Sequence, residues 1–226
     1  MDLLHQAVEL VRQLFDFFLH LDRHLRDIIA TYGGWTYLLL FLTVFCETGL
    51  VVTPFLPGDS LLFAAGAFAA TGALRLDALI LVLSAAAIVG DTANYWIGAA
   101  LRHRLADRGR LRFVKPQHLE RTHAFYEKYG AKTIIIARFV PIVRTFAPFV
   151  AGVGEMSYGK FMAYNVTGGI GWVVICTLAG YFFGNLPFVQ ENFSLVILAI
   201  IVISVLPAVV ELWKARRARS SAGATP

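Results

Sequence analysis

Five charged residues lie in stretches of this sequence that are otherwise apolar and are broken by proline and glycine: Glu47, Asp59, Asp91, Arg138 and Arg144. A charged side chain at the centre of a bilayer costs about 2.5–3.5 kcal/mol, so such residues face a cavity or one another and usually serve a function. The acids of segment 45–66 and the arginines of segment 137–152 therefore predict a polar transport site at mid-membrane.

The acids of the first segment can take up protons. Glu47 lies within an apolar run and has no cation near it in the sequence. It is therefore either protonated or paired with an arginine, because burial disfavours the carboxylate and a nearby cation favours it. Asp59 stands between Gly58 and Ser60 ahead of an apolar run, a pattern typical of a helix N-cap, and capping is compatible with proton binding. We predict that Glu47 and Asp59 couple the site to protons.

The arginines of the second segment supply the opposite charge. Arginine stays charged, and its planar fork binds phosphate oxygens through two hydrogen bonds at once, so Arg138 and Arg144 are candidate phosphate ligands. The alternative is that each is a structural counter-charge. Asp91, Asn94 and Tyr95 adjoin one another on one predicted helix and form a supporting polar group, either for transport or for hydrogen bonds between helices.

The elements that carry these residues are predicted to be membrane helices. Hydrophobic residues make up 58% of the 226 and charged residues only 15%, whereas a soluble domain has about 25% charged residues. We therefore expect an all-α integral membrane protein. Helix breaks are predicted at Pro54, Pro57, Gly58, Pro141 and Pro148. Each broken segment is expected to form a re-entrant hairpin, because irregular backbone at membrane depth is tolerated only inside protein or beside water.

The chain divides into three predicted parts. Residues 1–30 form an amphipathic interfacial helix that ends at Gly33-Gly34, residues 31–213 form a membrane domain, and residues 214–226 form a basic tail that we expect to be disordered. Within the membrane domain, the apolar stretch 35–53 precedes the first break, full spans are predicted at 78–100, 160–184 and 193–213, and a short helix is predicted at 117–128.

The distribution of basic residues predicts the orientation. Lys and Arg cluster in 101–132 and in the tail, so the positive-inside rule places both in the cytoplasm and 185–192 outside. Both clusters can also contact anionic lipid headgroups. With these sides fixed, the two broken segments enter the membrane from opposite faces.

A weak internal repeat agrees with this arrangement. Phe55-Leu56-Pro57 matches Phe139-Val140-Pro141, 84 positions later, and Tyr95-Trp96-Ile97-Gly98 matches Tyr181-Phe182-Phe183-Gly184, 86 positions later. Broken segments in corresponding halves of a transporter indicate its binding site. The predicted fold is therefore an inverted repeat with two opposed re-entrant hairpins plus spanning helices.

Other chemistries find little support in the sequence. It contains neither GxxxxGK[ST] nor HExxH, Cys46 and Cys176 have no metal-ligand spacing, and the serines of the apolar segments lack an evident base. We expect no enzyme activity, no cofactor and no metal site. The net charge of +5 is concentrated beside apolar segments, which argues against nucleic acid as a partner.

Four motifs give the chain a resemblance to the DedA family, within the VTT (SNARE-associated Golgi protein) superfamily. They are Glu47 followed by PFLPGDSLL (54–62), GDTANYWIG (90–98), RFVPIVRTFAPFVAG (138–152) and GGIGWVVICTLAGYFFG (168–184). The resemblance implies an inner-membrane protein with two opposed re-entrant hairpins and proton-linked transport of undecaprenyl phosphate or another phospholipid. The family's acidic pair maps onto Glu47 and Asp59, and its arginine pair maps onto Arg138 and Arg144.

The residues and the resemblance together predict a multi-pass, proton-coupled transporter of the inner membrane, with a cytoplasmic C-terminus. It would act as a lipid flippase that moves a lipid phosphate, such as undecaprenyl phosphate or a phospholipid headgroup. Two alternatives stay open: a proton-coupled antiporter of small ions or drug cations, and a structural membrane-organising protein. The sequence is also compatible with a homo-oligomer.

Overall fold

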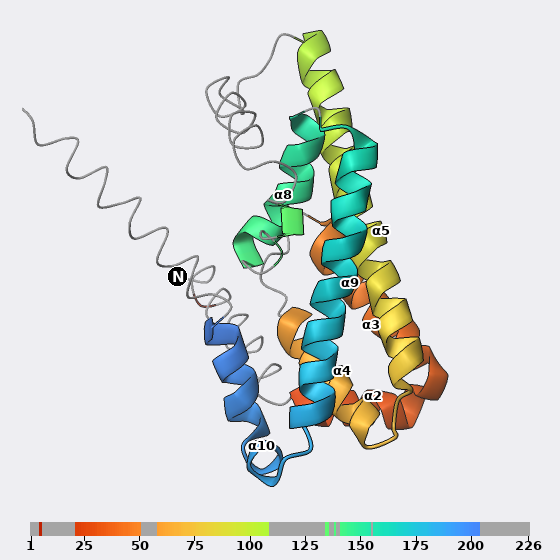
Figure 1. Cartoon of the computed structure of the whole chain (residues 1–226), viewed down its shortest axis with the longest axis vertical. Coiled ribbons are helices and arrows are strands. Elements are labelled where there is room, and N and C mark those ends of the chain that lie inside the picture. The colour runs from red at the N-terminus through yellow and green to blue at the C-terminus, as the bar shows by residue number, and fades with distance from the viewer. Residues whose placement is uncertain are drawn as a thin grey trace, which may run out of the picture. The chain divides into compact units, whose positions relative to one another are not determined.

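The secondary structure that the computed structural model describes is helical throughout (Figure 1). The described residues are His5, 21–50, 58–108, 134–135, 138, 141–154 and 156–203. The elements are α2 (Leu21–Tyr32), the 3-10 helix η1 (Gly33–Trp35), α3 (Thr36–Gly49), α4 (Gly58–Ala70), α5 (Leu76–Arg108), α8 (Pro141–Val153), α9 (Tyr158–Phe183) and α10 (Pro187–Glu191). A further apolar helix covers Phe193–Ile203. The all-α class predicted from the composition is confirmed.

Three helical stretches of the described chain are long and apolar enough to cross a membrane: Leu25–Gly49, Leu76–Arg102 and Tyr158–Phe183. The last two confirm the spans predicted at 78–100 and 160–184. Helix α5 runs on to Arg108, beyond the end predicted at 100, so the first part of the basic segment is also helical. Of the span predicted at 193–213, the described part is helical to Ile203, and 204–213 lies outside the described residues.

The two helices that follow the predicted breaks are short. Helices α4 and α8 have 13 residues each, which at 1.5 Å per residue gives about 20 Å, less than the roughly 30 Å of a bilayer core. Their lengths fit half-helices of the kind that the two broken segments predicted. The relative direction of the two segments stays a prediction.

The residues predicted to break helices lie at different kinds of position in the structure. Pro141 is the first residue of α8, a position where a missing backbone N–H costs nothing, and Gly58 is the first residue of α4. Pro148 is a correction: it lies inside α8 and ends no helix. A proline within a helix removes one backbone donor and can be tolerated when neighbouring groups satisfy the carbonyl that it frees. Pro54 and Pro57 lie outside the described residues.

The N-terminal helix ends where the glycines predicted. Helix α2 stops at Tyr32, and Gly33 has a φ of 51°, a left-handed conformation that glycine adopts without strain. Leu25 is buried, whereas Arg26 and Asp27 are exposed, as an amphipathic helix requires. The interfacial placement of 1–30 stays a prediction. Most of its first 20 residues, the helix predicted at 117–128 and the basic tail 214–226 lie outside the described residues.

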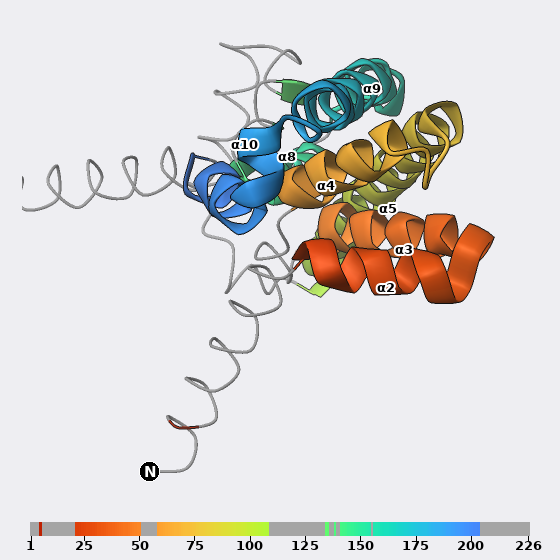
Figure 2. The same cartoon turned by 90° about the horizontal axis from the view of Figure 1, so that it is seen from below.

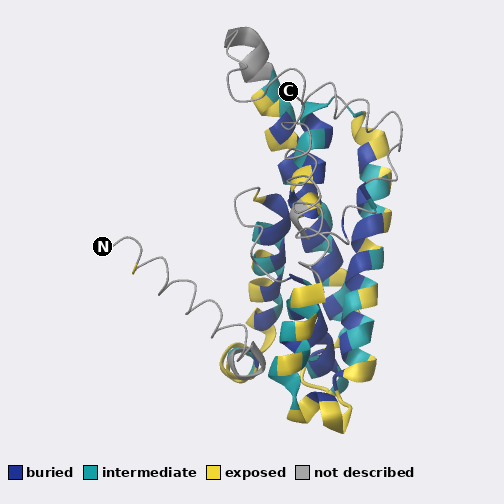
Figure 3. Cartoon of the chain, turned by 90° about the vertical axis from the view of Figure 1, so that its left-hand side faces the viewer, coloured by how far each residue is buried: buried dark blue, intermediate teal, exposed yellow. Residues whose placement is uncertain are grey.

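The chain forms two compact units. Unit 1 comprises 1–40, 57–82 and 173–202, and unit 2 comprises 41–56, 83–172 and 203–226. Buried and exposed positions alternate along the described helices, as expected for helices with one packed face and one face toward lipid (Figure 3).

In unit 1, helix α4 packs closely against the second half of α9 (Figure 2). A Cβ at Gly66 would collide with the carbonyl of Thr177, and it would lie 3.0 Å from the nitrogen of Tyr181. A Cβ at Gly180 would likewise collide with the carbonyl of Phe63. Small residues let two membrane helices approach this closely, so that van der Waals contacts hold them together.

Unit 2 contains the same packing between α8 and α5 (Figure 1). A Cβ at Gly152 would collide with the carbonyl of Tyr95, and it would lie 2.9 Å from the nitrogen of Ala99. A Cβ at Gly98 would collide with the carbonyl of Phe149. Each short helix thus packs on a spanning helix through one glycine from each partner.

The matching contacts support an internal duplication and refine its register. The short-helix positions correspond at 86 residues, since Phe63 and Gly66 play the parts of Phe149 and Gly152. The spanning-helix positions correspond at 82 residues, since 95, 98 and 99 in α5 match 177, 180 and 181 in α9. The Tyr-x-x-Gly match at 86 is therefore displaced by one helical turn, a shift that leaves the packing face unchanged. In both units the short helix of one half packs on the spanning helix of the other half.

Candidate functional site

A buried ion pair joins α3 to α8 in unit 2. Arg144 of α8 donates through Nη2 to Oε1 of Glu47 in α3, and the two side chains are only 3% and 1% exposed. The guanidinium carbon of Arg144 also lies 4.5 Å from the ring centroid of Trp172, which is itself buried. A cation over a desolvated tryptophan face gains about 2 kcal/mol. Glu47 and Trp172 together therefore hold Arg144 inside the unit.

A second buried ion pair joins α5 to the turn before α8. Arg138 lies in that turn, where its backbone N–H donates to the carbonyl of Ile135 at 3.2 Å. Its Nη2 donates to Oδ2 of Asp91 and to Oδ1 of Asn165, and lies 3.3 Å from the carbonyl oxygen of Asn165. The guanidinium is thus held from α5 and from α9.

Two glycines of α9 make room for the Arg138 side chain. A Cβ on Gly168 would lie 3.1 Å from Cδ and 3.2 Å from Nε of Arg138. A Cβ on Gly169 would lie 3.3 Å from Cγ1 of Ile88 and 3.4 Å from Nη2 of Arg138. These separations lie at or below the lower limit of ordinary van der Waals contact, so Gly168 and Gly169 form the floor on which the arginine lies.

Asn94 ties the elements of the two ion pairs together. Its side-chain nitrogen donates to the carbonyl of Thr48 at 3.0 Å and to the carbonyl of Thr145 at 2.8 Å. Thr48 follows Glu47 and Thr145 follows Arg144 in the sequence. A single buried amide on α5 therefore fixes the backbone beside both members of the first pair, three residues along the helix from Asp91.

Several polar atoms of the site make no hydrogen bond within the described part of the chain. They are Nε and Nη1 of Arg138, Oδ1 of Asp91 and Oδ1 of Asn94. Nε and Nη1 carry three of the five N–H donors of a guanidinium. Buried polar groups without partners are uncommon in native proteins and point to a bound molecule, to water or to a functional role.

The four charges of the site are balanced. Glu47, Asp91, Arg138 and Arg144 are all buried, and the charge of Arg144 also acts on Asp91 and on Arg138, so they form one electrostatic network. Removing one partner of a buried ion pair costs about 3–5 kcal/mol, because the other charge is left uncompensated. The pairs are therefore stable as pairs and costly to open without a replacement charge.

Unit 2 brings together most of the predicted site residues. Glu47, Arg138, Arg144, Asp91 and Asn94 all belong to it, and Asp91 is a full partner of an arginine rather than a peripheral polar residue.

Asp59 belongs to unit 1, where it is half-buried in the first turn of α4. A carboxylate in the first turn interacts favourably with the positive end of the helix dipole, and the N-cap role predicted for Asp59 stays a prediction. Its proton-coupling role stays a prediction.

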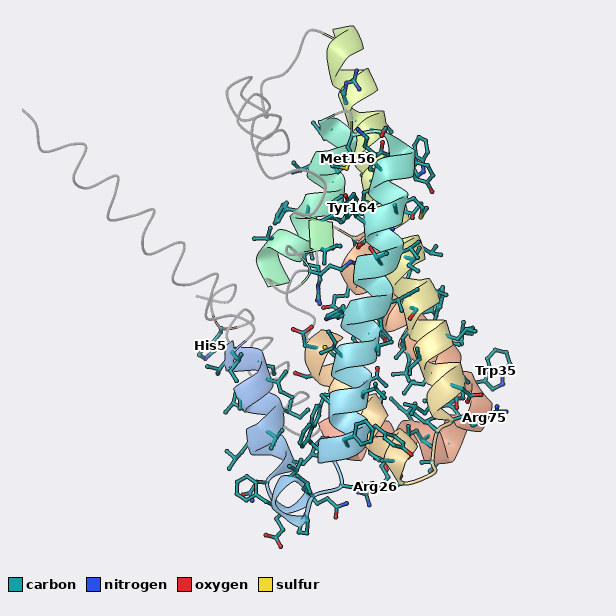
Figure 4. All side chains as sticks on the ribbon, viewed as in Figure 1. His5, Arg26, Trp35, Arg75, Met156 and Tyr164 are labelled. Carbon is teal, nitrogen blue, oxygen red and sulfur yellow. The ribbon has the colours of Figure 1, made fainter. Side chains whose placement is uncertain are left out.

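Tyr95 serves packing within the described residues. Its hydroxyl donates to the carbonyl of Met156 at 2.6 Å, and its ring stacks on Phe161 with centroids 4.6 Å apart. Met156 and Tyr164, labelled in Figure 4, pack against the same cluster. We therefore assign Tyr95 to the junction of α5, α8 and α9 rather than to the charged site.

Sequence reasoning missed Asn165 and Trp172. Asn165 is a polar residue in a predicted span, the kind of signal that marked Asp91, and Trp172 sits in the glycine-rich stretch of α9. In that stretch Gly168 and Gly169 face the side chain of Arg138. The described residues hold no cluster of three metal-ligating side chains.

Comparison with known proteins agrees with this architecture. The VTT domain matches residues 56–182. Protein DedA of Escherichia coli K12 is 54% identical over 217 residues, which cover 95% of this chain and 99% of that protein. The uncharacterized membrane protein Rv0364 of Mycobacterium tuberculosis H37Rv is 45% identical over 185 residues, 81% of each chain. The inner membrane protein YqjA of E. coli K12 is 32% identical over 188 residues, 80% of this chain and 86% of that protein. No solved structure matches this chain.

The helices and the buried ion pairs define a multi-pass membrane protein with a polar site inside its helical core. The length of the VTT-domain match and the sequence identity to the relatives then identify the family. The chain belongs to the DedA family of VTT-domain membrane proteins.

Proposed function

We propose that the protein is a proton-coupled transporter that carries the phosphate headgroup of a membrane lipid across the bilayer. Polyprenyl phosphate and phospholipid headgroups share the chemistry that the site requires, an anionic phosphate joined to an apolar tail. The tail stays in the lipid while the headgroup passes through a polar path, so the protein encloses only the phosphate. No covalent step is needed, and we propose that the chain is not an enzyme.

The observation that carries this proposal is the pair of buried arginines, each held by an acid. Arg138 keeps three N–H donors without partners among the described residues, and arginine donors in a dry site bind phosphate strongly because both partners are charged. Protonation of an acid neutralises its carboxylate and so weakens its bond to the arginine. A proton gradient can therefore control whether the arginines hold carboxylates or phosphate.

A cation antiporter is less well supported by the same geometry. A cation would need the carboxylates of Glu47 and Asp91, and both already bind arginines. It would also be repelled by two buried guanidinium groups at short range. A purely structural protein would use the ion pairs only to hold its helices together. Transport measurements distinguish this alternative from a transporter.

The test compares arginine variants on lipids with and without phosphate. Arg138→Lys and Arg144→Lys keep the charge and lose the planar fork, whereas Arg138→Gln and Arg144→Gln lose both. For the purified chain in liposomes, we expect flipping of fluorescent phosphatidylglycerol to fall from wild type to lysine to glutamine. A phosphate-free diacylglycerol-based glycolipid should not be transported above the protein-free rate. Equal transport of both lipids by the wild type would contradict the proposal.

The relatives suggest the membrane in which the chain acts. YqjA is named an inner membrane protein, and we propose the same location here, with 101–132 and the C-terminal tail in the cytoplasm. In unit 1, Trp35 and Arg75 project outward (Figure 4), and Arg75 pairs with the exposed Asp77. Tryptophan and charged side chains commonly meet the membrane–water interface.

A further inference from the structure

The buried charges of the described chain sum to zero. Glu47, Asp91, Arg138 and Arg144 are the charged residues among its buried positions, two acids and two arginines. Each acid is bonded to one arginine. A phosphate that enters this site brings additional negative charge into a region where an uncompensated charge is expensive.

Among the buried charges of the described residues, only the two acids can restore neutrality by taking up protons, since arginine does not change its charge. We propose that Asp91 is a second exchangeable acid beside Glu47, and that the number of protons the site takes up equals the negative charge of the phosphate group that enters. This inference rests on the proposed function. A phosphate monoester dianion would displace both carboxylates as neutral acids, and a diester monoanion would displace one.

The contacts of Arg138 favour exchange over a fixed strut. Its Nη2 bonds to Asp91, while Nη1 and Nε have no partner in the described part of the chain, and Oδ1 of Asp91 has none either. A strut optimised for stability would use both carboxylate oxygens and more of the guanidinium donors. This pair instead leaves hydrogen-bonding capacity on the arginine that a phosphate can use.

Asn165 provides the anchor that such an exchange requires. It accepts from Arg138 through its side-chain oxygen, and its nitrogen donates to the carbonyl of Ile88 at 3.0 Å and to the hydroxyl of Thr92 at 3.3 Å. Arg138 can therefore stay in place when Asp91, once protonated, releases it. Asn165 is uncharged, so it neither competes for protons nor alters the charge balance.

The groups that act on Asp91 come from every element around it. Arg138 and Arg144 act from the turn and from α8, and Glu47 acts from α3 through its pair with Arg144. Helix α9 contributes the uncharged Asn165. Proton uptake on Asp91 is therefore governed by the two arginines, both of which change partner when a dianion binds and one of which changes partner when a monoanion binds.

The experiment measures protons taken up per phosphate bound, with the full chain purified in detergent. The probes are octyl phosphate, a monoester, and methyl octyl phosphate, its matched diester, and octanol is the phosphate-free control. Binding is measured in weak buffer near pH 8, where a monoester with a second pKa of about 6 is already a dianion in solution. We expect two protons per octyl phosphate and one per methyl octyl phosphate, as two exchangeable acids require. Octanol should cause no uptake.

Substitutions assign the protons to residues. Asp91→Asn adds a net positive charge to the empty site, so uptake should fall to one proton for the monoester and to none for the diester. Asp77→Asn is the matched control, because Asp77 lies in the same helix and pairs with Arg75 but is exposed. It should leave both values at two and one. The infrared carboxyl band of the unsubstituted chain gives a second reading that does not depend on the folding of a variant.

Each outcome has a separate meaning. Equal uptake for the two phosphates, or unchanged uptake in Asp91→Asn, would overturn the inference while leaving phosphate transport intact. Loss of one proton in Asp59→Asn in place of Asp91→Asn would move the second acid to Asp59 and would also overturn it. If octyl phosphate binds no better than octanol, the proposed function itself fails.

Discussion

Replacing Gly168 by alanine adds a single atom, the Cβ, to the glycine surface on which the Arg138 side chain lies. The new Cβ would lie 3.1 Å from Cδ and 3.2 Å from Nε of Arg138, and 3.4 Å from Cα of Ile135. Arg138 cannot simply swing away, because Asp91 and Asn165 hold its guanidinium. The substitution must therefore either displace the backbone of α9 or weaken the contacts of the arginine.

The contact distances set the size of the effect. Overpacking of a tight interior costs about 1–3 kcal/mol, and alanine recovers about 0.5–1 kcal/mol of helix stability over glycine. Gly169→Ala should cost less than Gly168→Ala, since its nearest contacts are 3.3 and 3.4 Å. Gly171→Ala is the matched control in the same helix, because its Cβ would meet nothing within 4 Å.

The assay is tryptophan-monitored unfolding in detergent together with flipping of phosphatidylglycerol in liposomes. We expect stability to fall in the order Gly171→Ala, Gly169→Ala, Gly168→Ala, with the first at or above wild type. Flipping should fall in the same order, because Arg138, the proposed phosphate ligand, is displaced. Equal behaviour of Gly168→Ala and Gly171→Ala in both assays would refute the assignment of Gly168 to the arginine floor.

Three further predictions test other parts of the account. Glu47→Gln should make flipping independent of pH, and Asp59→Asn should do the same if Asp59 carries protons; flux driven by pH as in the wild type in both variants would make both acids structural. A single cysteine at position 110 of a cysteine-free chain should react with an impermeant maleimide only after the membrane is opened, and labelling from the outside alone would invert the topology. Asn94→Ala should lower the free energy of unfolding by about 2–6 kcal/mol, because two buried carbonyls lose their donor at about 1–3 kcal/mol each. Asn192→Ala is the control, because Asn192 is only half-buried and makes one exposed hydrogen bond, and equal destabilisation by the two variants would contradict the bridging role of Asn94.

The sequence was sufficient to predict the spans of α5 and α9 and the identity of the buried charges. Long apolar stretches cross a membrane whatever surrounds them, so composition and length located these helices. Intramembrane charges are rare and expensive, so Glu47, Arg138 and Arg144 stood out without any structure. An arginine partner was one of the two alternatives for Glu47, and the structure identifies it as Arg144.

The pairing of the second acid and the support around the arginines depend on tertiary contacts. Asp91 and Arg138 are 47 positions apart, and nothing local indicates which arginine an acid will meet. Asn165 and Trp172 become site residues only because α9 packs beside the turn at Arg138 and beside α8. Pro148 misled the sequence interpretation for a related reason: within a packed helix the surroundings can compensate for one missing hydrogen bond.

The central claim, that a proton gradient drives a lipid phosphate across the membrane, is tested most directly in liposomes that contain the wild-type chain alone. Flipping of fluorescent phosphatidylglycerol is recorded with an imposed pH gradient, with the gradient reversed and with the gradient collapsed by a protonophore. We predict that the direction of net flipping follows the gradient and that net flipping stops when the gradient is collapsed. Flipping that ignores both the sign and the presence of the gradient would contradict proton coupling.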